Sequence, residues 1–169
     1  LEYRYLSVKQ VAVITGVRDK SASALLLRLE RHQAFSSFGN TGIRGYGETP
    51  KIYFLTKRGY RLLADEYEAL GQEIASFKPV NITSRWSPLM YHRMDTLDVL
   101  ASLEHDFQSM QDYVRVATLV EYRREKIGRR WQTETTDYVA NPETSLNKIV
   151  PDAGFVIENR ASGKRALFL

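Results

Sequence analysis

The segment SVKQVAVITGVRDKSASALLLRLERH, which runs from residue 7 to residue 32, decides the fold of the first part of the chain. Ser7 can cap a helix over Val8–Thr15. Gly16 follows as the residue type that ends a helix at least cost, in the left-handed conformation. Asp19 or Ser21 can then cap a second helix that runs to the end of the segment. Two short helices joined by a tight glycine-containing turn predict a helix–turn–helix.

The second predicted helix is amphipathic. Its apolar side follows i, i+3, i+4, i+7 spacing and consists of Ala22, Leu25, Leu26 and Leu29. The opposite side is short and polar near its start and cationic toward its end, and it comprises Lys20, Ser23, Ala24, Leu27, Arg28 and Arg31. Short side chains let a helix approach base edges, while Arg and Lys reach bases or phosphates. The pattern fits a DNA recognition helix, and equally an ordinary helix with a solvated face.

A glycine-rich hairpin is predicted next. Residues 34–38 and 51–55 are its expected strands, and the loop over 39–47 holds four of the ten glycines together with Arg44. We expect Arg44 and Lys51 to follow a DNA backbone, as cations on such a loop contribute affinity more than sequence choice. A helix–turn–helix followed by this hairpin is the element order of a winged-helix domain, predicted here over residues 1–75.

A third helix is predicted to begin after Thr56, which can cap it. Lys57 and Arg58 occupy its first turn, where cations interact unfavourably with the helix macrodipole. Their presence there favours a role outside the helix, such as contact with a phosphate. Further along, one apolar stripe is formed by Tyr60, Leu63, Tyr67 and Leu70. We expect this stripe to cover the core of the domain; the alternative is contact with a second copy of the chain.

Positive charge is concentrated in the first third of the chain. Residues 1–61 hold eleven Lys and Arg against four Asp and Glu, a net charge of +7, whereas the whole chain carries +4 and the remainder therefore −3. A basic module on a near-neutral remainder is typical of a nucleic-acid-binding protein. The residues predicted to contact DNA are Lys20, Ser21, Ser23, Arg28, Arg31, Arg44, Lys51, Lys57 and Arg58.

Composition excludes several classes of function. The chain has no cysteine, which rules out disulfides, thiolate catalysis and cysteine-ligated zinc. No apolar run approaches the roughly 20 residues of a membrane span, and no signal peptide is evident, so we expect a cytoplasmic protein without a membrane partner. No phosphate-binding or dinucleotide fingerprint occurs, and His32, His92 and His105 lack acidic partners at metal-ligand spacing. We therefore expect no cofactor and no metal.

The second half is predicted to be a small α/β domain over residues 91–169, joined by a linker over 76–90. A helix over 91–110 carries an apolar stripe. Strands are expected over 114–120, 149–157 and 164–169. A basic turn over 123–131 ends in a tryptophan. Cations beside an aromatic ring could bind a nucleic-acid backbone and stack on a base, but a solvated hairpin tip fits the same residues equally well.

Two stretches carry a family resemblance. The segment KIYFLTKRGYRLLA, residues 51–64, is similar to the end of the wing in many bacterial winged-helix regulators. A winged helix, a helix opening at His92, and Pro151-Asp152-Ala153 before a strand together resemble the plasmid replication–relaxation family, which includes MobC-like mobilisation auxiliaries.

The resemblance implies a double-stranded DNA-binding accessory protein of a plasmid or mobile element, acting in relaxation, replication or mobilisation during conjugation, with a relaxase or replication initiator as a protein partner. The alternatives are a winged-helix repressor whose second domain dimerises and senses a ligand, and a module that docks another protein rather than DNA.

The second domain also resembles a truncated restriction-endonuclease-like core. In that fold an Asp after Pro and an acid-x-Lys on the next strand hold a divalent metal beside the scissile phosphate. Asp152 matches the first position, but the chain stops at Leu169, before the expected second group. We therefore expect no catalytic residues and no enzyme activity; a metal-dependent nuclease is the alternative.

Overall fold

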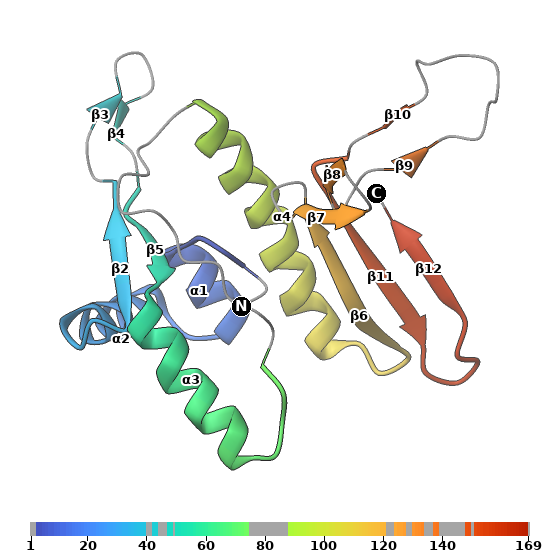
Figure 1. The fold of residues 1–169 in the computed structure, drawn as a ribbon, viewed down its shortest axis with the longest axis horizontal. Coiled ribbons are helices and arrows are strands. Elements are labelled where there is room, and N and C mark those ends of the chain that lie inside the picture. The colour runs from blue at the N-terminus through green and yellow to red at the C-terminus, as the bar shows by residue number, and fades with distance from the viewer. Residues whose placement is uncertain are drawn as a thin grey trace. The chain divides into compact units, whose positions relative to one another are not determined.

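The chain has an α+β fold, with four helices and small antiparallel sheets among the residues that the structure describes (Figure 1). The computed structural model describes residues 3–39, 42–43, 47–48, 50–74, 88–120, 124–127, 130–133, 137–138, 148–149 and 151–168. The chain divides into two compact units, Leu1–His105 and Asp106–Leu169. Within the described part of the chain, no helix has both the length and the apolar character needed to cross a bilayer.

The boundary between the units falls inside a helix, α4 (Pro88–Ser109), rather than in the predicted linker over 76–90. Residues 75–87 lie outside the described residues, but residues 88–90 are helical. The helix therefore starts three residues before the predicted position at 91. Proline is well suited to the first helical position because its missing N–H has no partner there in any case.

Helix α1 (Val8–Thr15) forms where the sequence predicts it. Ser7 and Gln10 make a reciprocal capping box, in which the Ser7 amide donates to Gln10 Oε1 at 2.8 Å and the Gln10 amide donates to Ser7 Oγ at 3.2 Å. Gly16 ends the helix with φ +67°, as expected. Helix α2 (Asp19–Arg31) begins after Arg18, which provides no side-chain cap, so the prediction that Asp19 or Ser21 caps this helix was wrong.

The first unit contains a three-stranded antiparallel sheet in the order β1 (Leu6–Ser7), β5 (Ile52–Leu55), β2 (Phe35–Phe38). Phe35 pairs with Leu55, and Phe38 pairs with Ile52. The hairpin that joins β2 to β5 also contains a short antiparallel pair, β3 (Gly42–Ile43) with β4 (Gly47–Glu48). Arg44 lies outside the described residues.

The core of the first unit is built from α1, α2 and the sheet. Its buried side chains there are Tyr5, Ala12, Ala22, Leu26, Ala34, Ile52, Tyr53 and Phe54. The ring of Phe38 packs edge-on against Tyr5 and tilted against Phe54, with both centroid distances 5.9 Å. Leu25, which we expected in the core, is 46% exposed.

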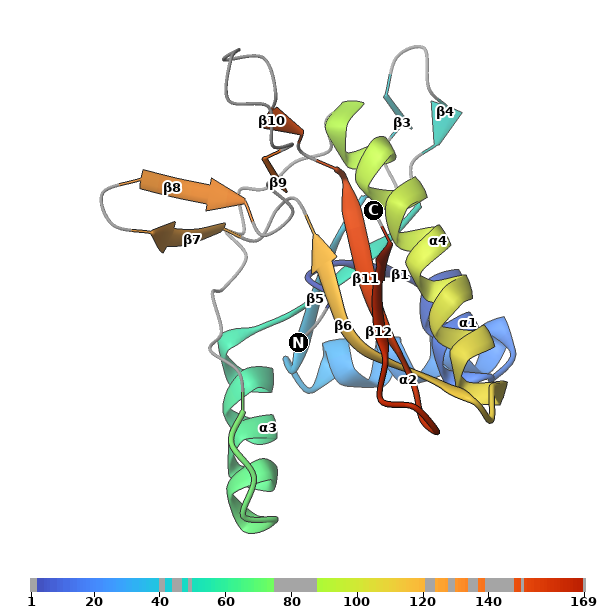
Figure 2. The same cartoon turned by 90° about the vertical axis from the view of Figure 1, so that its right-hand side faces the viewer.

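Helix α3 (Lys57–Ala69) follows β5, and Thr56 caps it as predicted, with Thr56 Oγ1 accepting from the Gly59 amide at 3.0 Å. Only its first turn is tightly packed: Gly59 is buried against the backbone of Ala34. In Figure 2 this end of α3 lies next to β5 and the other end points away from the sheet. The prediction that its apolar stripe covers the core was wrong, because Leu63, Tyr67 and Leu70 are all exposed.

Helix α4 is joined to α1 by one glutamine. Gln10, which is 2% exposed, donates from Nε2 to the carbonyl oxygen of Met94 at 3.1 Å and to Asp98 Oδ1 at 2.7 Å. The stripe predicted for this helix is Met94, Leu97, Leu100, Leu103 and Phe107; the first three are buried and the last two half-buried, and Met90 and Ala101 are buried as well. Most of α4 therefore belongs to the first unit and not, as predicted, to a separate second domain.

The second unit is organised around an antiparallel sheet in the order β12 (Arg165–Phe168), β11 (Ala153–Asn159), β6 (Tyr113–Val120). Phe155 stacks on Phe168 with centroids 5.1 Å apart and lies 5.8 Å from the ring of Phe107 at the end of α4. The predicted strands are confirmed with shifted ends. Two further antiparallel pairs join β7 (Arg124–Ile127) to β8 (Arg130–Thr133) and β9 (Asp137–Tyr138) to β10 (Lys148–Ile149).

Candidate nucleic-acid interface

Helix α2 presents one exposed face that carries cations. At about 100° of turn per residue, positions 20, 24, 27, 28 and 31 fall on the side opposite the buried Ala22 and Leu26. All of them are exposed, and so is Ser21 at the edge of the same face. Leu27, 39% exposed, therefore belongs to the outer face. Ser23 is half-buried at the flank of this face and is therefore less accessible than Lys20, Arg28 and Arg31.

Arg28 and Arg31 are the two cations in the last turn of α2. Both arginines stabilise α2 itself, because a positive charge near a helix C-terminus interacts favourably with the macrodipole. Yet among the described residues neither guanidinium forms an ion pair with a carboxylate.

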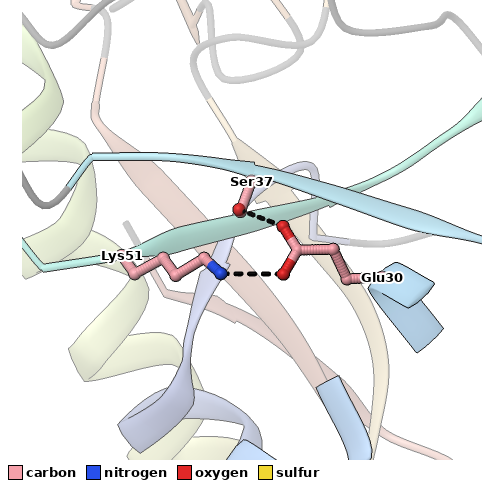
Figure 3. A network of polar contacts seen from close by, with 3 residues as sticks. All are labelled: Glu30, Ser37 and Lys51. Carbon is pink, nitrogen blue, oxygen red and sulfur yellow. Dashed lines mark hydrogen bonds and ion pairs between the residues drawn. The ribbon is translucent and has the colours of Figure 1, made fainter. Parts of the chain in front are cut away.

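Lys51 is held in a polar network that joins α2 to the hairpin (Figure 3). Its ammonium nitrogen lies 2.7 Å from Glu30 Oε2, and the other carboxylate oxygen of Glu30 accepts a hydrogen bond from the Ser37 hydroxyl. Lys51 Nζ also lies 5.0 Å from the centre of the Tyr53 ring. Glu30 comes from α2, Ser37 from β2, and Lys51 precedes β5. The network therefore fixes the helix against both strands, and Glu30 balances the charge of a predicted DNA contact.

The environment of this pair favours its charged forms. Burial by itself raises the pKa of Glu30, but the hydrogen bonds from Lys51 and Ser37, with the positive charge of Lys51, outweigh burial and hold this pKa below its ordinary value of 4.5. Burial likewise lowers the pKa of Lys51, but Glu30 and Tyr53 outweigh it and raise this pKa above 10.5. Both groups stay ionised in the folded protein near neutral pH.

We expect Glu30→Gln to lower the free energy of unfolding at neutral pH by about 0.5–1 kcal/mol, a modest loss because both side chains are partly solvated. A folded pKa below the unfolded one contributes stability that is present above pH 4.5 and lost as the pH falls through the folded pKa. The difference between wild type and variant should therefore shrink on acidification, as measured by urea unfolding at neutral and acidic pH. Glu66→Gln, at an exposed carboxylate of α3, serves as the control, and a gap that stays constant with pH would contradict the role of the pair.

The start of α3 brings two further cations close to the end of α2. Thr56 Oγ1 donates to the carbonyl oxygen of Gln33 at 2.6 Å, and the Thr56 amide donates to Ala34 O at 3.0 Å. Lys57 and Arg58 follow directly and are exposed. The first turn of α3 thus adjoins the residues that follow Arg31. Lys57 and Arg58 therefore directly follow the residue that contacts Gln33 and Ala34, two and three positions after Arg31, whereas Lys20 lies at the other end of α2.

The second unit provides no comparable constellation in the parts described. Across the described ranges, no group of three His, Asp or Glu side chains is placed to hold a metal ion. Asp152 is exposed, and Glu158 forms an ion pair with Arg165, with Glu158 Oε2 2.6 Å from the guanidinium Nε. Residues 123, 128 and 129 of the predicted basic turn lie outside the described residues, while the flanking strands β7 and β8 form a hairpin.

Sequence reasoning predicted the Ser7 cap but missed the reciprocal bond from Gln10, and it missed the network at Lys51. The reciprocal bond could have been found, because Ser-x-x-Gln before an apolar run is the known pattern of a capping box. The Glu30–Ser37–Lys51 network had no such signal, since Glu30 and Lys51 stand 21 positions apart and meet only once the strands pair.

Comparisons with protein-family models, curated proteins and solved structures found no match to this chain.

Proposed function

We propose that the protein binds double-stranded DNA through a winged-helix domain in its first part, with α2 as the recognition helix. The observation that carries this proposal is the exposed outer face of α2, which holds Lys20, Arg28 and Arg31 without ion-pair partners among the described residues. The element order supports it further, because two helices joined by a three-residue turn are followed by an antiparallel hairpin and a closing helix.

In the proposed complex, α2 enters the major groove, which is about 12 Å wide and admits one helix. Lys20 and Ser21 approach from the N-terminal end of the helix, and the short side chain of Ala24 permits close approach to the bases. Leu27 offers an apolar contact of the kind that fits a thymine methyl group. Arg28 and Arg31 reach bases or phosphates, and Lys57 and Arg58 hold the backbone beside the end of the helix.

The ion pair at Lys51 has a positioning role in this proposal. Because Glu30 lies in α2 and contacts residues of both hairpin strands, it keeps the hairpin at a defined angle to the recognition helix. The hairpin loop with Arg44 then follows the DNA backbone, and Lys51 acts mainly through the network rather than as a freely extended cation.

We further propose a role without catalysis, as an accessory protein in plasmid or mobile-element relaxation, replication or mobilisation, in which the DNA-bound protein recruits a relaxase or replication initiator. The support is the resemblance in residues 51–64, at His92 and at Pro151-Asp152-Ala153. The second candidate function is a dimeric winged-helix repressor, which the exposed apolar residues of α3 favour. Binding near a transfer or replication origin supports the first, and binding to a promoter palindrome as a dimer supports the second.

The salt dependence of duplex binding tests the DNA interface. If Lys20, Arg28, Arg31, Lys57 and Arg58 each displace one counterion, the logarithm of the association constant should fall against the logarithm of salt concentration with a slope of about −4.5. Fluorescence anisotropy with random-sequence duplexes over a range of salt concentrations measures this slope. Binding that is absent at low salt, or that does not weaken as salt is added, would contradict the proposal.

A further inference from the structure

One row of residues runs along the outer side of α2. Positions 20, 24, 27 and 31 fall within about 60° of one another around the helix, on the side opposite the buried Ala22 and Leu26. All four are exposed, and this central row of α2 consists of Lys20, Ala24, Leu27 and Arg31. The two ends of the row are cationic and its two middle positions are apolar. The row therefore changes in chemistry along its length.

The length of the central row suits the groove that α2 is proposed to enter. At 1.5 Å per residue its ends lie about 16 Å apart along the helix axis, which is roughly five base-pair steps of 3.4 Å. The long side chains of Lys20 and Arg31 can reach phosphates from the two ends. The short side chain of Ala24 lets the middle of the helix approach the bases. A helix that lies along the groove thus faces the central base pairs with its apolar middle.

Leu27 is the larger of the two apolar residues in this middle, and it is 39% exposed. It has no hydrogen-bonding group to offer to the base that it covers. In the major groove the bases present donors and acceptors, and the one apolar group is the methyl on carbon 5 of thymine. Over a base without this methyl group, leucine would exclude water from polar groups and replace none of their hydrogen bonds. Leu27 therefore favours a methyl group and disfavours its absence.

Given the DNA-binding function proposed above, on which this rests, we infer that Leu27 selects a 5-methylpyrimidine at the centre of the DNA site. Thymine supplies this methyl group, and so does 5-methylcytosine. The cations at the ends of the central row supply affinity without choosing a sequence, because every nucleotide carries the same phosphate. Methylation of a cytosine that lies under Leu27 consequently strengthens binding.

Duplexes that differ only in their 5-methyl groups test this selection, by fluorescence anisotropy with the full chain at constant low salt. An alternating adenine–thymine duplex is compared with its adenine–uracil counterpart, and an alternating guanine–cytosine duplex with the same duplex methylated on carbon 5 of each cytosine. In each pair the methylated duplex should bind about fourfold more tightly, as expected for the burial of one methyl group. A preference in one pair alone also supports the selection and identifies the base that supplies the methyl group.

Two leucine variants separate Leu27 from a general apolar effect. Leu27→Ala should abolish the preference and leave the salt slope unchanged, because the variant loses an apolar contact and no cation. Alanine favours the helix at this exposed position, so the fold is retained. The control Leu25→Ala removes the same side chain from a position that is 46% exposed and about 160° around the helix from Leu27, and it should keep the preference.

The outcomes distinguish the selection by Leu27 from DNA binding itself. Equal affinity of the wild type for both members of each pair overturns the selection and leaves the DNA-binding function standing. A preference that survives in Leu27→Ala has the same consequence. A wild type that binds none of the four duplexes at low salt contradicts the DNA-binding function, and the selection with it.

Discussion

Replacing Arg28 and Arg31 together with alanine is expected to weaken duplex binding at low salt by roughly 2–6 kcal/mol, which is about 30-fold or more. Both guanidinium groups lie on the exposed face of α2 and lack a carboxylate partner in the described parts of the chain. Their loss should also reduce the magnitude of the salt slope by about 1.8, because two counterions fewer are displaced. Fluorescence anisotropy titrations at several salt concentrations measure both effects.

A matched control separates a specific contact from a general loss of positive charge. Arg160→Ala with Lys164→Ala removes the same charge from exposed positions of the second unit, and it should leave affinity and slope nearly unchanged. Circular dichroism checks that α2 is retained in the test variant, since both arginines also favour the end of their helix by up to about 1 kcal/mol each. Equal affinity of the two double variants would remove α2 from the interface.

Gly59→Ala is expected to destabilise the protein by about 2 kcal/mol or more. Alanine is about 1 kcal/mol better than glycine inside a helix, so helix propensity alone predicts the opposite sign. In the structure, however, alanine does not fit at this position, because its Cβ would lie 2.1 Å from Ala34 O and 2.8 Å from Ala34 C. These are backbone atoms, and the same oxygen accepts hydrogen bonds from the Thr56 amide and hydroxyl. Relieving the overlap must shift the backbone and weaken these bonds.

Chemical unfolding followed by far-ultraviolet circular dichroism measures this effect. Gly71→Ala provides the comparison, because Gly71 has φ +68° and no atom within 4 Å of the added Cβ. Its cost should come from the left-handed backbone alone, about 1–2 kcal/mol. If Gly59→Ala were as stable as wild type or more so, the close packing of α3 against the turn after α2 would be refuted.

Local signals in the sequence predicted the elements of the fold better than their packing. Gly16, Thr56 and the apolar strand before Thr56 act on neighbouring residues, so their effects could be anticipated from composition and spacing. The sequence also predicted which side of α2 is buried, but it made that side too wide. Leu25 lies at the margin of the buried side, and periodicity alone does not tell whether another element reaches that far.

Properties that depend on distant residues were not accessible in the same way. The stripe of α3 is visible in the sequence, yet whether a neighbour covers it depends on how α3 leaves the sheet. The assignment of α4 to the first unit rests on the Gln10 contacts with Met94 and Asp98, 84 and 88 positions away in the chain. For that reason the second unit begins at Asp106 and not at residue 91, where the sequence analysis placed the start of the second domain.

Gln10 is chemically constrained by what surrounds it. Its Oε1 must accept a hydrogen bond from the Ser7 amide, while its Nε2 must donate to Met94 O and to the Asp98 carboxylate. Glutamate would set a second negative charge against two acceptors, leucine would leave three polar groups without this partner, and asparagine is one methylene too short to span both helices. A primary amide at this length is thus the one natural side chain that can complete the cap at the start of α1 and hydrogen-bond to α4 at the same time, so the choice of residue at position 10 affects two helices at once.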